Sequence, residues 1–326
     1  GLPNMDIFAK HFFVNTAMEA SEAEKTSKRV RVKANNIDVL VSKLSGGNQQ
    51  KVVLAKWLVR DINVLIMDEA SVTAMNTCRD AGIPVIAMFN HVNVDRESYP
   101  YYVFVGSDNV EAGRLTGAYC AENLKENANV CIILGRGGIN QTEDVRNGIQ
   151  QGLFDVRSDV ALLDEQNTDD YRADAVDLAE NWMQAYQSQG VDCILGYCDD
   201  SILGAIQAIK SAGRDTDDFL LCGRDASEEA CLSIINGDLD YTLLQDAFGQ
   251  CDACIDIAKG LIDGKSIGDY DDVIIPYVEV TDENVDQIMM EQYNYGLRVC
   301  LSCRCGRVPR RNARGASGWH ESTGGH

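Results

Sequence analysis

Two strings near the start of the chain place small residues and acids where phosphate chemistry would need them. The first is Leu44–Lys51, in which Ser45 precedes two glycines and a run of three amide side chains. Ser45 predicts a helix cap, and free backbone amides at a helix N-terminus beside small residues can bind phosphate. The second is Val64–Glu69, in which four apolar residues precede two acids at the expected carboxyl end of a strand.

Both strings resemble parts of an ABC transporter ATPase. The block Leu44–Glu69 is similar to the signature motif and Walker B strand, in the version found in the second nucleotide-binding domain of monosaccharide importers. The resemblance implies that Ser45 and Gly47 contact the γ-phosphate of ATP held by a partner domain, that Asp68 holds Mg²⁺ through water and that Glu69 polarises the attacking water. The residues implied as nucleotide-binding are Ser45, Gly46, Gly47, Gln49 and Asp68.

The remaining parts of an ATP site are missing from the sequence. No Gly-x-x-x-x-Gly-Lys-Ser/Thr loop occurs in the 326 residues, so the cradle for the β- and γ-phosphates is absent. Ala70 follows Glu69 where the family has proline. We therefore expect no ATP hydrolysis by this chain alone, with ATP and Mg²⁺ as cofactors only if a partner completes the site. The other interpretation is that this helix and strand only pack.

From Val64 onward, short apolar runs alternate with segments of helical period. The predicted strands are Val64–Met67, Pro84–Met88, Tyr102–Val105, Val130–Leu134, Val160–Leu163, Cys193–Leu195, Phe219–Cys222 and Tyr241–Leu244. The predicted helices are Ser71–Ala81, Asn109–Leu124, Thr142–Phe154, Tyr171–Gln187, Asp199–Ser211, Ser227–Ile235 and Phe248–Asp263. This alternation predicts parallel sheets covered on both faces, in two similar lobes joined by crossing segments.

Composition limits the class of protein further. A chain of 326 residues with 45% hydrophobic content can form two modest cores, and no apolar run is long enough to cross a bilayer. The formal charge of −21 and a pI near 4.5 disfavour nucleic acid as a partner. The scatter of cysteines through apolar segments, as at Cys131, Cys193, Cys222 and Cys231, predicts reduced, buried thiols. No secretory signal is visible.

From about Glu69 to Met290 the chain is similar to the periplasmic sugar-binding proteins of the ribose and galactose/glucose type. The strings that carry the resemblance are 82–90, 102–108, 223–226, 244–246 and 275–278, in this order and spacing. The resemblance implies an α/β fold with two doubly wound parallel-sheet lobes and a hinge, which close on a monosaccharide between the carboxyl ends of their strands.

The same resemblance implies a set of sugar contacts. Asn90 stands where the family places an amide on sugar hydroxyls, Arg146 matches a sugar-binding arginine, and Tyr171 stands where an aromatic ring stacks on the sugar. Asp225 and Gln245 end strands and can bond hydroxyls. The full set is Asn90, Asn140, Arg146, Tyr171, Asp199, Asp225 and Gln245. Each also has a structural interpretation: loop backbone for the amides, packing for Tyr171, and an ion pair with Glu143 for Arg146.

The chain departs from the family in two places. Cys198 stands where a hydrogen-bonding amide is usual, and Asp199 or Tyr197 could replace that contact. The family's first strand, helix, strand and helix are missing, and the ATPase-like fragment stands in their place. Because the missing first strand would lie beside the third, we expect an unpaired sheet edge at Val64–Met67 unless the leading residues cover it, and we expect Gly137–Gln245 to be the most stable part.

The expected domains are an ATPase fragment at 1–69, an incomplete first lobe at 70–136 and 246–290, a second lobe at 137–245 and a disordered basic tail at 291–326. No calcium loop like that of the galactose-type proteins occurs between Asn123 and Val130. The tail cysteines with His320 could be read as zinc ligands, but an out-of-frame terminus explains the composition more simply, so no metal is expected.

We therefore expect the solute-binding component of a bacterial ABC sugar importer, with a pentose or hexose and a membrane permease as partners. The alternative is a remnant of the ATP-binding subunit of the same transporter. A sugar-responsive regulator would reuse the two lobes, but no helix-turn-helix is legible before Ser71. The binding domain would be periplasmic or on the cell surface, and the ATPase fragment cytoplasmic.

Overall fold

The chain forms two compact units. Unit 1 comprises Gly1–Ser107 and Asp246–Pro276, and unit 2 comprises Asp108–Gln245 and Tyr277–His326. The computed structural model describes residues 4–10, 13–60, 62–67, 72–92, 101–169 and 171–293. The units differ from the expected lobes at 108–136 and at 277–290, because the strands in these two segments pair with strands of unit 2. The expected tail lies almost entirely outside the described residues.

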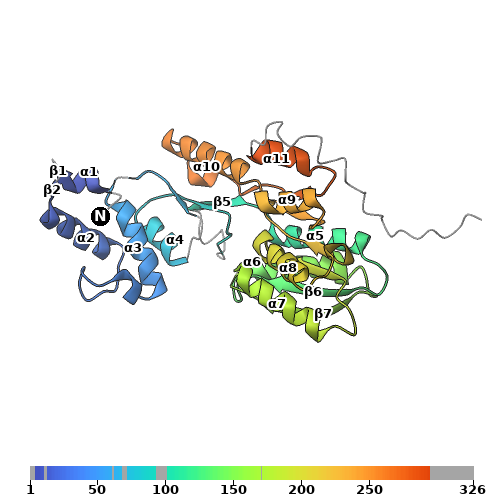
Figure 1. Cartoon of the computed structure of the whole chain (residues 1–326). Helices are drawn as coiled ribbons and strands as arrows, with labels where there is room; N and C mark the ends of the chain where they lie inside the picture. Colours follow the sequence, from blue (N-terminus) through green and yellow to red (C-terminus); the bar gives the residue numbers. More distant parts are fainter. Residues whose placement is uncertain are drawn as a thin grey trace, which may run out of the picture. The chain divides into compact units, whose positions relative to one another are not determined.

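Unit 2 alternates strands with helices along the chain (Figure 1). Its strands are β6 (Asn129–Leu134), β7 (Ala161–Asn167), β8 (Cys193–Gly196), β9 (Leu220–Cys222), β10 (Thr242–Leu244) and β12 (Val278–Val280). Its helices are α5 (Asn109–Asn123), α6 (Asn140–Ile149) with the π-helical η3 (Gln150–Phe154), α7 (Arg172–Ala185), α8 (Asp199–Ser211), η4 (Thr216–Asp218), α9 (Glu228–Asn236) and α11 (Val285–Tyr293).

The main sheet of unit 2 is parallel, in the order β7-β6-β8-β9. Parallel bridges at Cys222↔Tyr241 and Asp225↔Leu244 join β10 to the β9 side, and β10 pairs antiparallel with β12. This confirms the predicted α/β class. The prediction that the second strand of this sheet ends at Leu163 was too short, since β7 runs on to Asn167. β7 lies at the edge of the sheet, where polar residues are tolerated. Its last residues are polar, so an apolar pattern did not reveal them as strand.

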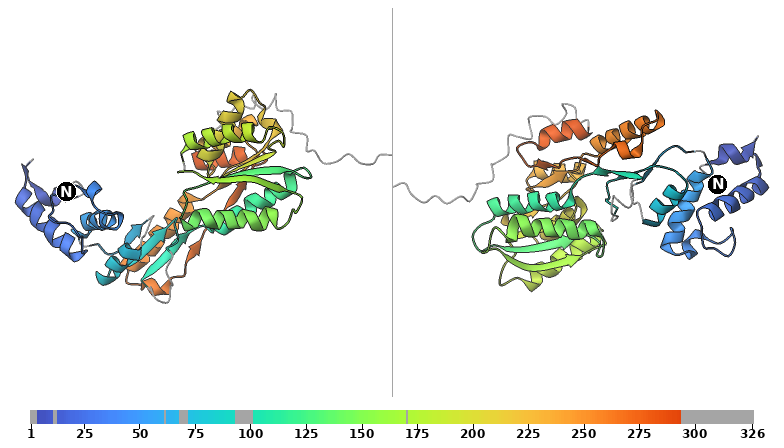
Figure 2. Two further views of the ribbon diagram at one scale, coloured as in Figure 1. Left: turned by 90° about the horizontal axis from the view of Figure 1, so that it is seen from below. Right: turned by 180° about the vertical axis from the view of Figure 1, so that it is seen from behind.

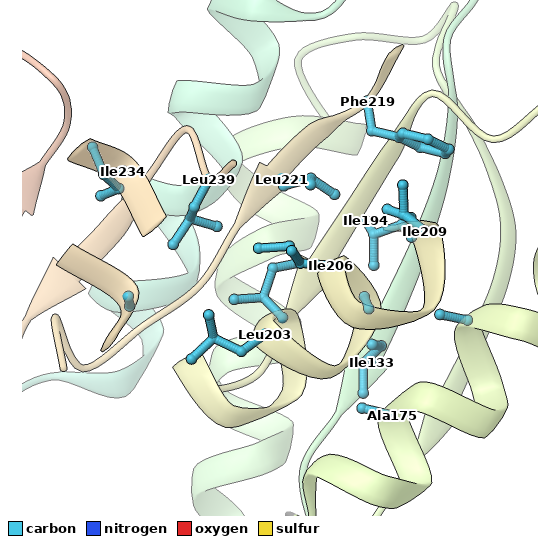
Figure 3. Close-up of a cluster of buried hydrophobic side chains, with 14 of the residues drawn as sticks. Ile133, Ala175, Ile194, Leu203, Ile206, Ile209, Phe219, Leu221, Ile234 and Leu239 are labelled. Carbon is cyan, nitrogen blue, oxygen red and sulfur yellow. The ribbon is translucent and has the colours of Figure 1, made fainter. Parts of the chain in front are cut away.

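Side chains on the two faces of this sheet enter two different cores, as the alternation of a strand requires. Cys131 and Ile133 face a cluster with α7, α8, α9 and α11, whereas Val130 and Ile132 face a cluster with α5 and α6. Figure 2 shows the sheet with helices on both faces. Figure 3 shows Leu203, Ile206 and Ile209 of α8 clustered with Ile194 and Leu221 of the sheet.

Helices α5 and α6 approach so closely that only glycine fits between them. A Cβ atom on Gly113 would lie 2.0 Å from the Val145 carbonyl oxygen, and one on Gly148 would lie 2.0 Å from the Val110 carbonyl oxygen. One turn further on, Gly117 and Gly152 meet the opposing backbone in the same way. Backbone cannot move aside as a flexible side chain can, so these four glycines set the distance between the two helices.

Unit 1 has a smaller sheet and a mostly helical N-terminal part. Its helices are α1 (Met5–Phe8), α2 (Thr16–Arg29), η2 (Val41–Lys43), α3 (Gly46–Leu58), α4 (Val72–Asp80), α10 (Ala247–Ile262) and η5 (Ile267–Asp269). Its strands are β1 (Ala9–Lys10), β2 (Phe13–Val14), β3 (Leu65–Met67), β4 (Val85–Met88), β5 (Tyr102–Gly106) and β11 (Val273–Ile274). The parallel sheet has the order β11-β5-β4-β3.

The ATPase-like helix α3 shares a core with the rest of unit 1. Leu54 and Leu58 of α3 are buried in one cluster with Met75 of α4 and Val85 of β4. Among the described residues β3 pairs only with β4, so it forms the expected unpaired edge, and Ile66 is 41% exposed there. The leading residues therefore cover a face of this sheet and leave its edge unpaired.

The cysteines of the described ranges are all unbridged. Seven of the nine are buried, including the four singled out from the sequence. The Cys120 thiol of α5 has its Sγ 3.6 Å from that of Cys222 on β9. Within the described part of the chain, no helix combines the length and the apolar character needed to span a bilayer.

The α5–α6 contact predicts that Gly148→Ala destabilises unit 2, although alanine is normally the better helix former. The added methyl would overlap the Val110 carbonyl, and overpacking of this kind costs about 1–3 kcal/mol. Urea unfolding followed by circular dichroism and tryptophan fluorescence should show a lower midpoint. Gly137→Ala is the control, because its methyl would meet nothing closer than 3.6 Å. Equal midpoints for the two variants would contradict the prediction.

Candidate functional site

Five of the seven predicted ligand residues follow the carboxyl ends of the strands of unit 2. Asn140 follows β6, Tyr171 follows β7, Asp199 follows β8, Asp225 follows β9 and Gln245 follows β10. Because these strands run parallel, their carboxyl ends meet at one edge of the sheet. The chain passes from β6 outward to β7 and then back to β8, and ligands of open α/β sheets bind at such a reversal.

Asp225 presents an accessible carboxylate at this edge. Its side chain is 45% exposed, and one oxygen lies 3.8 Å from Nε of Arg224. The backbone there is unusual, with φ of 117° at Asp225 and 50° at Ala226, a region that residues other than glycine rarely adopt. The Asp225 amide donates to the Leu243 carbonyl at 2.7 Å, which holds the loop against β10.

Asp199, in contrast, is buried and its oxygens are engaged inside unit 2. Oδ1 accepts a hydrogen bond from Thr242 Oγ1 at 2.7 Å, and Oδ2 accepts one from the Ser227 amide at 2.6 Å. Burial, and then the nearby charge of Asp225, raise the pKa of Asp199 to about 7. The carboxyl group thus connects the loops after β8 and β9, and Gly223 must be glycine because a Cβ would lie 2.6 Å from Asp199 Oδ1.

Tyr197 and Cys198, the two residues before Asp199, do not expose a strong sugar partner. The Tyr197 ring is buried and lies under the guanidinium of Arg224, whose central carbon is 4.4 Å from the ring centroid. The Cys198 thiol is half-buried with its Sγ 3.4 Å from Ser201 Oγ, and burial raises its pKa. A protonated thiol is a weak hydrogen-bond partner.

Tyr171, Asn140 and Gln245 are accessible to different degrees. Tyr171 is the N-cap residue of α7 and is 65% exposed, so a flat apolar ring face is open to solvent. Asn140 is the first residue of α6 and is exposed, and Gln245 is half-buried directly after β10. These side chains offer one ring and two amides at the edge that also carries Asp225.

Arg146 makes its contacts along β7 instead of at the strand ends. Its guanidinium forms an ion pair with Glu165, donates to Gln150 Oε1 at 3.2 Å and lies over the Phe154 ring. Glu165 pairs with Ile132 in the middle of the sheet, two residues before the carboxyl end of β7. The expected structural alternative, an ion pair with Glu143, is replaced by one with Glu165.

Asn90 is the predicted ligand residue that belongs to unit 1. It is half-buried and is the second residue after β4. Phe89, between the strand and Asn90, has a φ of 63°. The Asn90 amide donates to the Met88 carbonyl at 2.7 Å in a tight turn. The turn brings the amide side chain to the carboxyl end of β4, the position that the sequence predicted.

The ATPase-like motif keeps its helix but uses its polar groups locally. Ser45 is the N-cap residue of α3, yet its hydroxyl makes no capping bond and instead accepts from Asn48 Nδ2 at 2.9 Å. Gln49 Nε2 donates to the Leu44 carbonyl at 2.8 Å. Gly46 and Gly47 form the first turn of α3. Asp68 and Glu69 lie outside the described residues.

A buried polar group next to Asp225 was missed by the sequence analysis. Arg224 has only 6% of its side chain exposed, and its Nη1 lies 3.4 Å from Asn109 Oδ1. The same oxygen accepts from the Tyr277 hydroxyl at 3.3 Å. An arginine directly after an apolar strand was the available signal, since such a position is otherwise apolar. In the described ranges no three His, Cys, Asp or Glu side chains gather as metal ligands would.

Comparison with known proteins agrees with this architecture. The chain is 27% identical over 248 residues to a putative rhizopine-binding protein of Rhizobium meliloti, which covers 73% of this chain and 77% of that protein. It is 24% identical over 250 residues to a ribose import binding protein of Bacillus subtilis, and the match covers 75% of this chain and 76% of that protein. A solute-binding protein of Bacillus halodurans solved with myo-inositol superposes with a TM-score of 0.67 at 24% identity, covering 83% and 92%.

A second kind of relative matches a short stretch only. The chain is 48% identical over 68 residues to a xylose import ATP-binding protein of Thermoanaerobacter pseudethanolicus, which is 21% of this chain but only 14% of that protein. The predicted resemblance to an ABC transporter ATPase is therefore confirmed for a fragment. The model of the periplasmic binding protein domain matches residues 22–266, more than half of the sequence, so the chain belongs to the periplasmic binding protein domain family.

Proposed function

We propose that this chain is the solute-binding component of an ABC-type sugar importer and that its ligand is a monosaccharide or a cyclic polyol. The observation that carries the proposal is that the exposed Asp225 carboxylate, two accessible amides and an open tyrosine ring all follow the carboxyl ends of parallel strands, at one edge of the sheet. Carboxylate and amide groups bond hydroxyls in pairs, and a ring face covers the apolar side of a sugar. The names of the relatives support the same class of ligand.

Within this proposal the predicted residues take different roles. We assign ligand contacts to Asp225, Tyr171, Asn140 and Gln245 of unit 2, and Asn90 of unit 1 stays a predicted ligand residue. Of the four in unit 2, Asp225, Tyr171 and Asn140 are exposed and Gln245 is half-buried, so all four are accessible to a ligand.

Asp199 and Arg146 are better explained as positioning residues. Both Asp199 oxygens already accept hydrogen bonds, one from Thr242 of β10 and one from the Ser227 amide after β9, and Arg146 is engaged with Glu165 on β7. A ligand would have to displace these bonds before it could use either group, and leaving a buried polar group unpaired costs about 1–3 kcal/mol. Their effect on binding would be indirect, through the loops that they hold.

The partner and the location follow from the same proposal. A binding protein of this family would deliver its ligand to a membrane permease, in the periplasm or at the cell surface. The ATPase-like fragment would contribute packing, because α3 is buried against α4 and β4. The match to an ATP-binding protein supports a second proposal, a remnant of that subunit, for which we expect no ATP hydrolysis by the chain alone.

Calorimetric titration of the purified chain tests the proposal directly. The panel is ribose, xylose, galactose, glucose and myo-inositol, with ATP as the control. We expect saturable binding of at least one sugar or polyol and none of ATP. No binding by any member of the panel, in a protein that still unfolds cooperatively, would contradict the proposed function.

Asp225→Asn should weaken ligand binding by about tenfold or more. The amide keeps the size but loses the charge, and hydrogen bonds to charged groups are worth about 1.5–3 kcal/mol. Asp177→Asn, at an exposed position on α7, is the matched control and should change the dissociation constant by less than about twofold. Titrations of both variants with the ligand identified above make the comparison; an equal effect of both substitutions would contradict the role of Asp225.

Asp199 should make the stability of unit 2 depend on pH. Its pKa of about 7 lies above the ordinary value of 3.8, so the folded state binds a proton that the unfolded state releases. The resulting stabilisation is full below about pH 4 and is lost as pH rises towards 7. Asp199→Asn should remove this dependence, because its amide can donate to Thr242 and accept from Ser227. Calorimetric melting of both proteins from pH 4.5 to 8 should therefore give converging or crossing curves, whereas parallel curves would contradict the prediction.

A further inference from the structure

Arg224 is a buried cation at the edge of the unit 2 sheet. Burial alone would lower the pKa of its guanidinium, but the Asp225 carboxylate and the Tyr277 and Tyr197 hydroxyls raise it, so the group is charged. Its Nε is buried without a hydrogen-bond partner among the described residues, 3.8 Å from the Asp225 carboxylate. A buried charge without full hydrogen bonding is costly, and such groups persist mostly where they have a function.

The Arg224 side chain contacts two of the three segments at which the chain leaves unit 2, and the neighbouring residue Asp225 contacts the third. Unit 2 begins at Asp108, ends its central part at Gln245 and resumes at Tyr277. Asn109, one residue after the first of these points, accepts hydrogen bonds on Oδ1 from both Arg224 and Tyr277. Arg224 therefore links the first and third segments through a single shared oxygen.

The second segment is held through Asp225. The Asp225 amide donates to the carbonyl of Leu243, and Asp225 forms a parallel bridge with Leu244, the residue before Gln245. The next amide, that of Ala226, donates to Thr242 Oγ1 at 3.2 Å. These bonds keep two consecutive residues at positive φ, a conformation that costs free energy unless its surroundings impose it.

We propose that Arg224 is a positioning residue for ligand binding, which fixes the Asp225 carboxylate and couples it to the three segments that connect unit 2 to the rest of the chain. This inference rests on the proposed function, since it takes Asp225 as a ligand contact. A ligand hydroxyl that donates a hydrogen bond to Asp225 alters the interaction between the Asp225 carboxylate and the Arg224 guanidinium. Because the same guanidinium interacts with Asn109 and Tyr277, those contacts are altered as well. Arginine suits this role because its planar fork can serve several acceptors in fixed directions.

Arg224→Met tests the coupling, since it keeps length and apolar packing but removes the charge and its donors. We expect ligand affinity to fall at least about tenfold. The matched control is Arg214→Met, because Arg214 also lies over an aromatic ring in unit 2, 4.5 Å from the Phe219 centroid, but away from these segments. The control should stay within about twofold of the wild type, and Arg224→Lys should recover part of the lost affinity. Wild-type affinity in Arg224→Met would overturn the proposal.

The pH dependence of ligand binding distinguishes an electrostatic role of Arg224 from a purely structural one. Without the cation, Asp225 becomes easier to protonate, so binding by Arg224→Met should be lost at a higher pH than in the wild type. The other titratable groups that interact with this carboxylate or the guanidinium are Asp199, Tyr197, Cys198, Tyr277 and Tyr293. Asp199→Asn in both backgrounds removes the contribution of that acid. A parallel loss of affinity at all pH values would overturn the electrostatic role.

Two further measurements keep the outcomes distinct. Should Arg224→Met fail to fold, Tyr277→Phe removes only the hydroxyl on Asn109, and unchanged affinity in that variant would overturn the coupling. Unfolding midpoints of Arg224→Met, Asp225→Asn and the double variant need no ligand; we expect non-additive shifts, and additive shifts would overturn the link. If the wild type binds no member of the sugar panel, the proposed function fails. The unfolding midpoints of the two single variants and the double variant still decide whether Arg224 and Asp225 are coupled.

Discussion

The parallel pairing of β6 with β7 on one side and β8 on the other is the constraint on which unit 2 depends. It sends the crossover helices to opposite faces and brings the ends of all the strands to one edge. The close glycine contact between α5 and α6 then fixes one helical layer against the sheet. With both layers set, the loops at the strand ends have little freedom, and the polar side chains that they carry acquire defined positions.

Buried ionisable groups give that edge its electrostatic character. Asp199 lies under the loops and is neutral over much of the acidic range, whereas Arg224 stays charged beside Asp225. Asp225 is thus an exposed anion supported from below by one buried cation. A neutral, hydroxyl-rich ligand suits such a carboxylate, because its hydroxyls donate without bringing a net charge into the site.

Periodicity predicted most strands and helices of the two units because their apolar residues are regularly spaced. It missed the polar half of β7, whose residues 164–167 lie at a sheet edge. The position of a candidate residue was predictable where it follows a strand, as for Asp225 and Gln245. Side-chain partners were not: nothing local to Arg146 indicates Glu165, and nothing local to Arg224 indicates Asn109 or Tyr277, because these partners are brought together only by tertiary structure.

The free thiols of the core bear on how this chain could mature. Cys120, Cys193 and Cys222 are fully buried between α5 and the sheet, with two of their sulfurs 3.6 Å apart. In the folded protein they are shielded from reagents, but during synthesis or export they are not. A chain that folded in an oxidising compartment would have to bury them before an oxidant captured them. The yield of active protein would then depend on whether folding is faster than oxidation of the thiols. The rate of folding, and not the final stability, would decide this.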